Sequence, residues 1–158
     1  MQAPVPSQDP LFQRSWWEDR IQGLDQAAST IELTPRPDLS TAERTVSEFH
    51  LRTHDGDHLF ALLARPAGTP EPVPARIRCC GPAEPPELDP LAAVEGIAEI
   101  LVQEIAGRRL EDRVLDMVST FRVARSTPGL DGSRVMPAEG SLPDELRIAQ
   151  RLSDWKFC

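Results

Sequence analysis

The chain has 158 residues, which is enough for one domain with a substantial core and hardly enough for two. Its formal net charge of -8 disfavours non-specific binding to nucleic acid or to an anionic membrane. Three cysteines do not form a disulfide framework, and the sequence has neither a signal-peptide pattern nor a run long enough to span a membrane. We therefore expect a cytoplasmic protein without nucleic-acid or membrane partners, and no motif predicts a cofactor.

Residues 1–44 are predicted to form an N-terminal extension with one amphipathic helix, and residues 45–158 to form the main domain. The helix is expected over residues 10–26, where Asp9 supplies the N-cap and Pro10 the first helical position. Two neighbouring tryptophans favour an anchor for this helix over a ligand platform. Its apolar stripe comprises Phe12, Trp16 or Trp17, Ile21 and Leu24.

Residues 45–66 are predicted to form a β-hairpin. Apolar runs flank Asp55-Gly56, and glycine supplies the positive φ that hairpin turns require. His54, His58 and the aspartates between them offer nitrogen and oxygen ligands around this turn. However, a hairpin turn points its polar side chains outward and apart, and no second element supplies a matching ligand pair. We therefore expect a solvated turn without a metal, and a metal-binding hairpin is the weaker alternative.

The middle of the chain predicts a strand, a loop and a helix in turn. A stiff proline-rich linker precedes residues 75–80 (ARIRCC), which form a short candidate strand. A helix is expected from Pro90, with Asp89 as its N-cap, to Gly107 as its C-terminal stop. Residues 99–105 (EILVQEI) also fit a buried strand, because short apolar runs do not separate the two structures.

Residues 108–152 predict a helix, a turn, a short strand, a sharp turn and a second helix. Charged residues of both signs along the predicted helices are interpreted as solvated faces. Pro128-Gly129 and Asp131-Gly132 break the chain before a short strand at residues 134–136. The apolar face of the first helix comprises Leu110, Val114, Met117, Val118 and Phe121.

Ser141 follows the predicted strand and precedes a helix, which is where an α/β-hydrolase carries its nucleophile. The nucleophile turn is so tight that glycine is favoured two residues on either side, whereas this chain has Glu139 and Pro143. The alternative is an ordinary turn in which Ser141 or Asp144 caps the final helix. All three histidines precede Ser141, so the usual order of serine, acid and histidine does not occur in this sequence.

Cys79 and Cys80 are adjacent and do not form a C-x-x-C pair. Adjacent cysteines form a disulfide only with a strained peptide, so we expect both to act as small buried apolar side chains.

The order of these motifs resembles the acetyl xylan esterase and dienelactone hydrolase side of the α/β-hydrolase superfamily. Members open with a strand pair around a T-x-D-G-x-x-L turn that ends in an x-x-x-P exit. Later they carry an R-P-x-V-D-x-x-R-I turn and then a strand leading into the nucleophile. The matching residues here are Thr53, Asp55, Gly56, Leu59 and Pro66 in the first motif, Thr127 to Val135 in the second, and Ser141 at the nucleophile position. The resemblance also places Cys80 and Gly81 at the His-Gly oxyanion loop, with cysteine in place of histidine.

The resemblance implies an α/β fold: a truncated hydrolase-like sheet of three to five strands, with an N-terminal β-hairpin and flanking helices. About half of the family's domain is matched, and the strands that deliver its acid and histidine are not. We therefore expect a degenerate hydrolase-like protein in which self-association or a protein partner covers an open sheet edge. The alternative is an ester hydrolase that uses Ser141 and takes its base from another chain.

Overall fold

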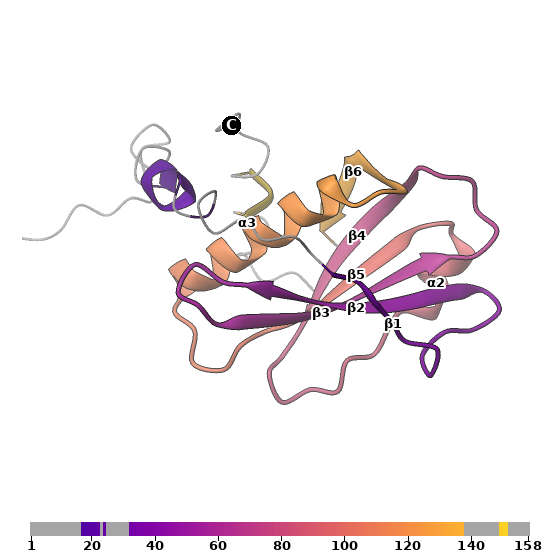
Figure 1. Ribbon diagram of the computed structural model, residues 1–158, viewed down its shortest axis with the longest axis horizontal. Coiled ribbons are helices and arrows are strands. Elements are labelled where there is room, and N and C mark those ends of the chain that lie inside the picture. Colours follow the sequence, from indigo (N-terminus) through magenta and orange to yellow (C-terminus); the bar gives the residue numbers. More distant parts are fainter. Residues whose placement is uncertain (1–16, 23, 25–31, 138–148, 152–158) are drawn as a thin grey trace, which may run out of the picture.

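The computed structural model describes residues 17–22, 24, 32–137 and 149–151. These residues form a six-stranded mixed sheet flanked by helices (Figure 1), in agreement with the predicted α/β class. The sheet has more strands than the three to five expected, because a two-residue strand is added at one edge. The elements are β1 (Thr34–Pro35), β2 (Arg44–Arg52), β3 (His58–Pro66), β4 (Val73–Cys80), α2 (Pro90–Val94), β5 (Ala98–Gln103), α3 (Leu110–Ser126) and β6 (Leu130–Pro137).

The strands lie in the order β1-β2-β3-β5-β4-β6. The pairs β1–β2, β2–β3 and β3–β5 are antiparallel, whereas β4 pairs in parallel with both β5 and β6. Parallel neighbours need crossover connections, and α2 and α3 lie in the two that join β4 to β5 and β5 to β6. The sheet therefore has an antiparallel part built from the hairpin and a parallel part built from β-α-β units.

The predicted hairpin is confirmed. β2 and β3 pair along their whole length, from Arg44 opposite Pro66 to Arg52 opposite His58. Gly56 has a φ of +89° in the connecting turn, which is the left-handed conformation that the turn requires.

The prediction of one helix from Pro90 to Gly107 is wrong beyond Val94. Asp89 does cap the helix start, since its carboxylate accepts a hydrogen bond from the Leu91 N–H. Gly96, at a φ of +73°, then turns the chain, and β5 follows where the strand alternative had been noted. β5 is buried on both faces between β3 and β4, so its sequence is continuously apolar and resembles a buried helix.

The prediction of helix α3 is confirmed except for one residue of its apolar face. Val114, Met117, Val118 and Phe121 are buried as expected, whereas Leu110 in the first turn is 56% exposed. The turn after α3 also forms as predicted, since Gly129 has a φ of +87°.

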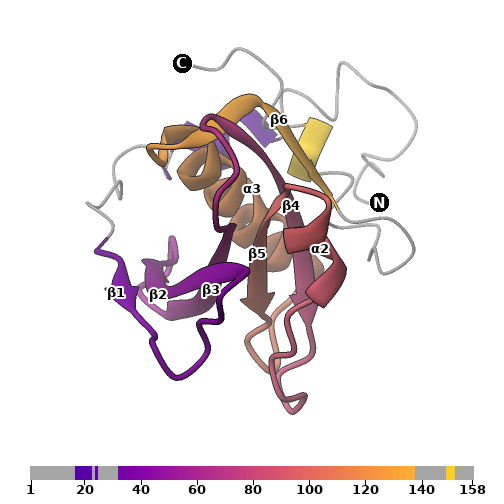
Figure 2. The same ribbon diagram turned by 90° about the vertical axis from the view of Figure 1, so that its right-hand side faces the viewer.

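Two apolar clusters lie on opposite faces of the sheet. In β5, Ile100 and Val102 join the larger cluster with α3, whereas Leu101 joins the smaller one with Leu62 and Cys80. This alternation follows from the two-residue repeat of a strand. Figure 2 shows α3 and the short α2 on opposite sides of the sheet.

The N-terminal extension contributes to the larger cluster. Residues 17–22 and 24 are helical, and Ile21 and Leu24 are buried among the side chains of the sheet and α3. Trp17 packs against the same cluster, as expected of an anchor. Phe12 and Trp16 lie outside the described residues.

β6 contains the predicted strand and is the outermost strand on its side of the described sheet. Between its pairings with Val73 and Ala75 it uses more residues than β4, so residues 131–134 bulge out. The Asp131 carboxylate accepts hydrogen bonds from the Ser133 N–H at 3.1 Å and from the Ser133 hydroxyl at 2.6 Å. The chain break expected at Asp131-Gly132 is therefore a bulge inside the strand.

Candidate functional site

Three parallel strands end at one edge of the sheet, which we call the carboxyl edge. It is formed by Cys80 of β4, Gln103 of β5 and Pro137 of β6. The hairpin turn lies at the same edge, because β3 runs antiparallel to β5 with Ala61 opposite Val102. In open α/β sheets ligands bind outside the carboxyl ends of the strands, so this edge is the candidate functional site.

The loop after β4 contains the predicted oxyanion residues Cys80 and Gly81. The Cys80 carbonyl accepts a hydrogen bond from the Glu104 N–H at 3.0 Å, so it points toward β5. The peptide between Cys80 and Gly81 is trans, and its N–H therefore points the opposite way, toward the side on which β6 lies. This position is where the resemblance assigns an oxyanion loop, and the role itself stays a prediction.

Gln103 fixes the shape of this loop. Its side-chain amide donates to the carbonyl of Glu84 at 3.1 Å and to that of Pro82 at 3.4 Å. The Glu84 N–H closes a turn on the Gly81 carbonyl at 3.1 Å. The Glu84 carboxylate lies against Gly81, because a β-carbon on that glycine would be 3.1 Å from Glu84 Oε1.

The end of β4 disfavours negative charge. Burial raises the pKa of the Cys80 thiol, the charges of Glu84 and Glu104 raise it further, and Arg78 opposes them. Cys80 therefore lacks the electropositive surroundings that activate a nucleophilic thiol. Cys79 packs against the larger core cluster, with its sulfur 3.4 Å from that of Met117, so both cysteines fill apolar space as expected.

Ser141 lies outside the described residues, as do Glu139 and Pro143 at the elbow positions. The described part of this region is β6, which ends at Pro137 shortly before the serine. The nucleophile role of Ser141 stays a prediction.

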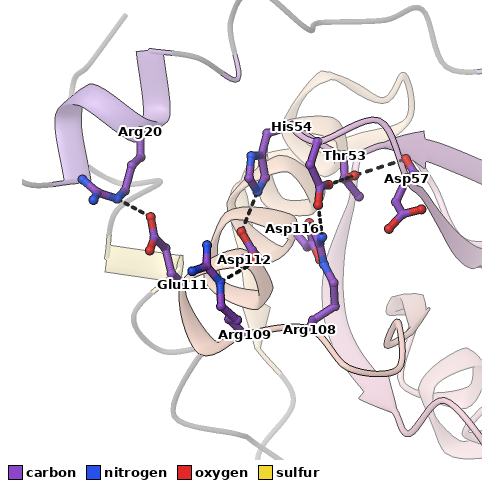
Figure 3. A network of polar contacts seen from close by, with 10 residues as sticks. Arg20, Thr53, His54, Asp57, Arg108, Arg109, Glu111, Asp112 and Asp116 are labelled. Carbon is purple, nitrogen blue, oxygen red and sulfur yellow. Dashed lines mark hydrogen bonds and ion pairs between the residues drawn. The ribbon is translucent and has the colours of Figure 1, made fainter.

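The hairpin turn is exposed at residues 54–58, as the sequence predicted, but two of its polar side chains do not point away from the rest of the molecule. His54 Nε2 lies 2.8 Å from Asp112 Oδ1 in the first turn of α3, and Asp55 pairs with Arg108 just before that helix (Figure 3). The turn therefore packs its polar side chains against α3. Among the described residues, no group of three or more His, Cys, Asp or Glu could hold a metal ion, so these contacts give the metal-binding alternative no support.

Arg108 lies at the centre of this polar network. It contacts Asp55 Oδ2 at 2.5 Å and binds both carboxylate oxygens of Asp116, at 2.7 Å and 3.1 Å. The side chains of Arg108 and Asp116 are only 5% and 3% exposed. Burial raises the pKa of Asp116, and the Arg108 guanidinium opposes that shift.

The contacts of Arg108, Asp112 and Asp116 were not predicted, because the charged residues along the predicted helices were interpreted as solvent-exposed. Asp112 and Asp116 are four residues apart and share one face of α3, and Arg108 lies two residues before the first residue of that helix. This spacing, together with a hairpin turn that contains histidines, was the sequence pattern from which a polar contact between the turn and the helix could have been predicted. The contacts of the Gln103 side chain could not be predicted from the sequence, because Gln103 binds backbone carbonyls of another loop.

The sequence matches no family model and no curated protein. Solved structures do match. Acetyl xylan esterase 1 from Thermoanaerobacterium sp. superposes with a TM-score of 0.72 and 15% identity, over 96% of this chain and 56% of that one. Acetyl xylan esterase from Paenibacillus sp. R4 gives 0.65 and 14%, over 85% of this chain and 53% of that one. The protein has an α/β-hydrolase-like fold.

A cold-adapted esterase from an Arctic intertidal metagenomic library matches less closely, with a TM-score of 0.51 and 11% identity over 68% of this chain. The chain thus spans about half the length of the esterases to which its hydrolase-like fold is similar. Within the described residues, no helix combines the length and apolarity needed to cross a membrane.

Replacing Arg108 with methionine is expected to destabilise the hydrolase-like fold by about 3–5 kcal/mol, because Asp116 would stay buried without its counter-charge. Urea denaturation would measure the loss. Arg109→Met is the matched control: its side chain is 77% exposed, and we expect a change below about 1 kcal/mol. Equal losses in the two variants would contradict the central role of Arg108.

Asp55 is expected to make stability depend on acidic pH. Hydrogen bonds from Thr53 and then Arg108 lower its pKa from 3.8 to about 2, so folding favours its charged form. The resulting stabilisation is complete above pH 3.8 and is lost as the pH falls to about 2. Thermal unfolding across this range should show a steeper fall for the wild type than for Asp55→Asn; parallel curves would show that the contact does not stabilise the fold.

Proposed function

We propose that the protein acts in the cytoplasm by associating with another polypeptide, on a hydrolase-like scaffold that lacks a complete catalytic triad of its own. The observation that supports this most directly is the position of β6. It is the outermost strand of the described sheet, and Met136 within it is 60% exposed. An open edge with an exposed large apolar side chain favours contact with another chain.

The opposite edge of the sheet is less suited to pairing. β1 has only two residues, and one of them, Pro35, has no N–H to donate. In β6 the bulge at residues 131–134, the charge of Arg134 and the missing N–H of Pro137 also limit strand pairing, so the contact would centre on the exposed side chain of Met136. A second copy or a different protein could cover this short segment.

The chemistry of the carboxyl edge supports a non-catalytic role. His54 is bound to Asp112, and His50 packs its ring against Phe60 with centroids 5.4 Å apart. Cys79 and Cys80 are present as thiols and not as a disulfide, which suits the reducing conditions of the cytoplasm.

The association is tested by measuring mass with light scattering across a range of concentrations. We expect Met136→Lys to shift the wild-type oligomer to monomer, because it places a charge in the contact. Leu91→Lys is the control, since Leu91 is 61% exposed but lies on α2. Loss of the oligomer in both variants would exclude a contact specific to β6, and a monomeric wild type would exclude self-association.

A carboxylic-ester hydrolase is the second candidate function, with Ser141 as nucleophile and a base supplied by another chain. It is favoured by the placement of the Gly81 N–H on the side where β6 ends. The fold likeness to proteins that are named acetyl xylan esterases suggests an acetyl ester as the substrate class.

Hydrolysis of p-nitrophenyl acetate by the wild type and by Ser141→Ala separates the two candidates. Under the leading proposal we expect equal rates close to the uncatalysed background. Activity that disappears in Ser141→Ala would overturn that proposal and direct attention to an oligomer interface as the source of the base.

A further inference from the structure

The connection from β4 to α2 packs on the face of the sheet that carries the smaller apolar cluster. It comprises residues 81–89, which we call the strap, and its Leu88 side chain packs against that cluster. Within the part of the chain that the structure describes, residues 82–88 make no backbone hydrogen bond to a strand. Three of them are prolines, which have no N–H to donate: Pro82, Pro85 and Pro86.

The strap is held by polar side chains that project from this face. Gln103 lies two residues after Leu101 of the smaller cluster, so strand alternation puts it on the same face. Arg78 lies two residues before Cys80 and is on that face for the same reason. Gln103 donates to two carbonyls of the strap, at 3.1 Å and 3.4 Å, and Arg78 donates to the carbonyl of Glu87.

The two ends of the strap are held differently. The Asp89 N–H lies 3.2 Å from each carboxylate oxygen of Glu99, whose side chain is only 3% exposed. The Asp89 carbonyl accepts from Arg44 at 3.4 Å, and the Asp89 carboxylate caps α2. At the other end, Gln103 binds a segment that is exposed throughout residues 82–87. The strap therefore has a fixed end at Asp89 and a weaker attachment at Gln103.

The closed strap lies close to Cys80. This thiol is only 7% exposed, and the negative charge of Glu84 in the strap contributes to raising its pKa. Segments held by a few exposed polar contacts open at a lower free energy than a paired sheet. We propose that the strap opens about Asp89 while the strands stay paired, that opening uncovers Cys80 and the smaller cluster, and that Gln103 holds the strap closed. This goes beyond the proposed function, because it concerns a face of the sheet and not the contact at β6.

Alkylation of the two adjacent thiols by iodoacetamide tests the strap in the full chain. Cys79 packs with the larger cluster on the other face, so opening of the strap does not uncover it. In Gln103→Leu we expect Cys80 to react about tenfold faster than in the wild type, because two hydrogen bonds that favour the closed strap are lost. The rate at Cys79 and the free energy of unfolding in urea should stay close to their wild-type values. Tandem mass spectrometry assigns the label to each thiol, and measurement over a range of pH separates exposure of Cys80 from a change in its pKa.

Gln22→Leu is the matched control, because it makes the same substitution at an exposed position of the N-terminal helix. Both thiols are expected to react in it as they do in the wild type. Four results would each overturn the proposal: an unchanged Cys80 rate in Gln103→Leu, an equal gain at both thiols, a gain matched by the loss of unfolding free energy, or the same gain in Gln22→Leu. Association at β6 is measured separately by light scattering, so a failure of one proposal does not imply failure of the other.

Discussion

The fold depends on one buried cation. Arg108 lies in the connection between β5 and α3, where it binds Asp55 of the hairpin turn and both oxygens of Asp116 in the helix. The hairpin belongs to the antiparallel part of the sheet, and α3 connects two strands of the parallel part. The Arg108 guanidinium thus joins the two parts at the carboxyl edge, together with the contact between His54 and Asp112. Removing a charge from water is costly, so this contact is stable only because all three groups are present together.

The same network determines which surface of the hairpin is available. His54 and Asp55 would be free to bind a ligand in an isolated turn, but here both are bound by residues at the start of α3. On the other side of the carboxyl edge, the Glu84 side chain lies against Gly81, and the Gln103 side chain binds the backbone carbonyls of Pro82 and Glu84. Fold likeness and site chemistry are separate observations in this protein.

The parts of the fold that were predictable are those governed by local rules. Asp55-Gly56 specified the hairpin, Asp89 with Pro90 specified a helix start, and the repeat of Val114, Val118 and Phe121 specified α3. The length of α2 was not predictable in the same way, because the apolar run of β5 satisfies both periodicities and only its burial between two strands decides. The buried charges at residues 108 and 116 were also missed, since their burial depends on a turn that is distant in sequence. Ser141 lies outside the described residues, so the predicted nucleophile was not tested.

The alternation of β4 has a consequence for its two thiols. Cys79 packs with the larger apolar cluster and Cys80 with the smaller one, so a single strand separates two neighbouring sulfur atoms. Each thiol therefore lies on a different face of the sheet, although the two residues are adjacent in sequence. A reagent that needs both sulfurs at once, such as a trivalent arsenical, would have to break the pairing of β4 with β5 before it could react. Resistance to such a reagent would therefore measure how stably the carboxyl ends of β4 and β5 stay paired.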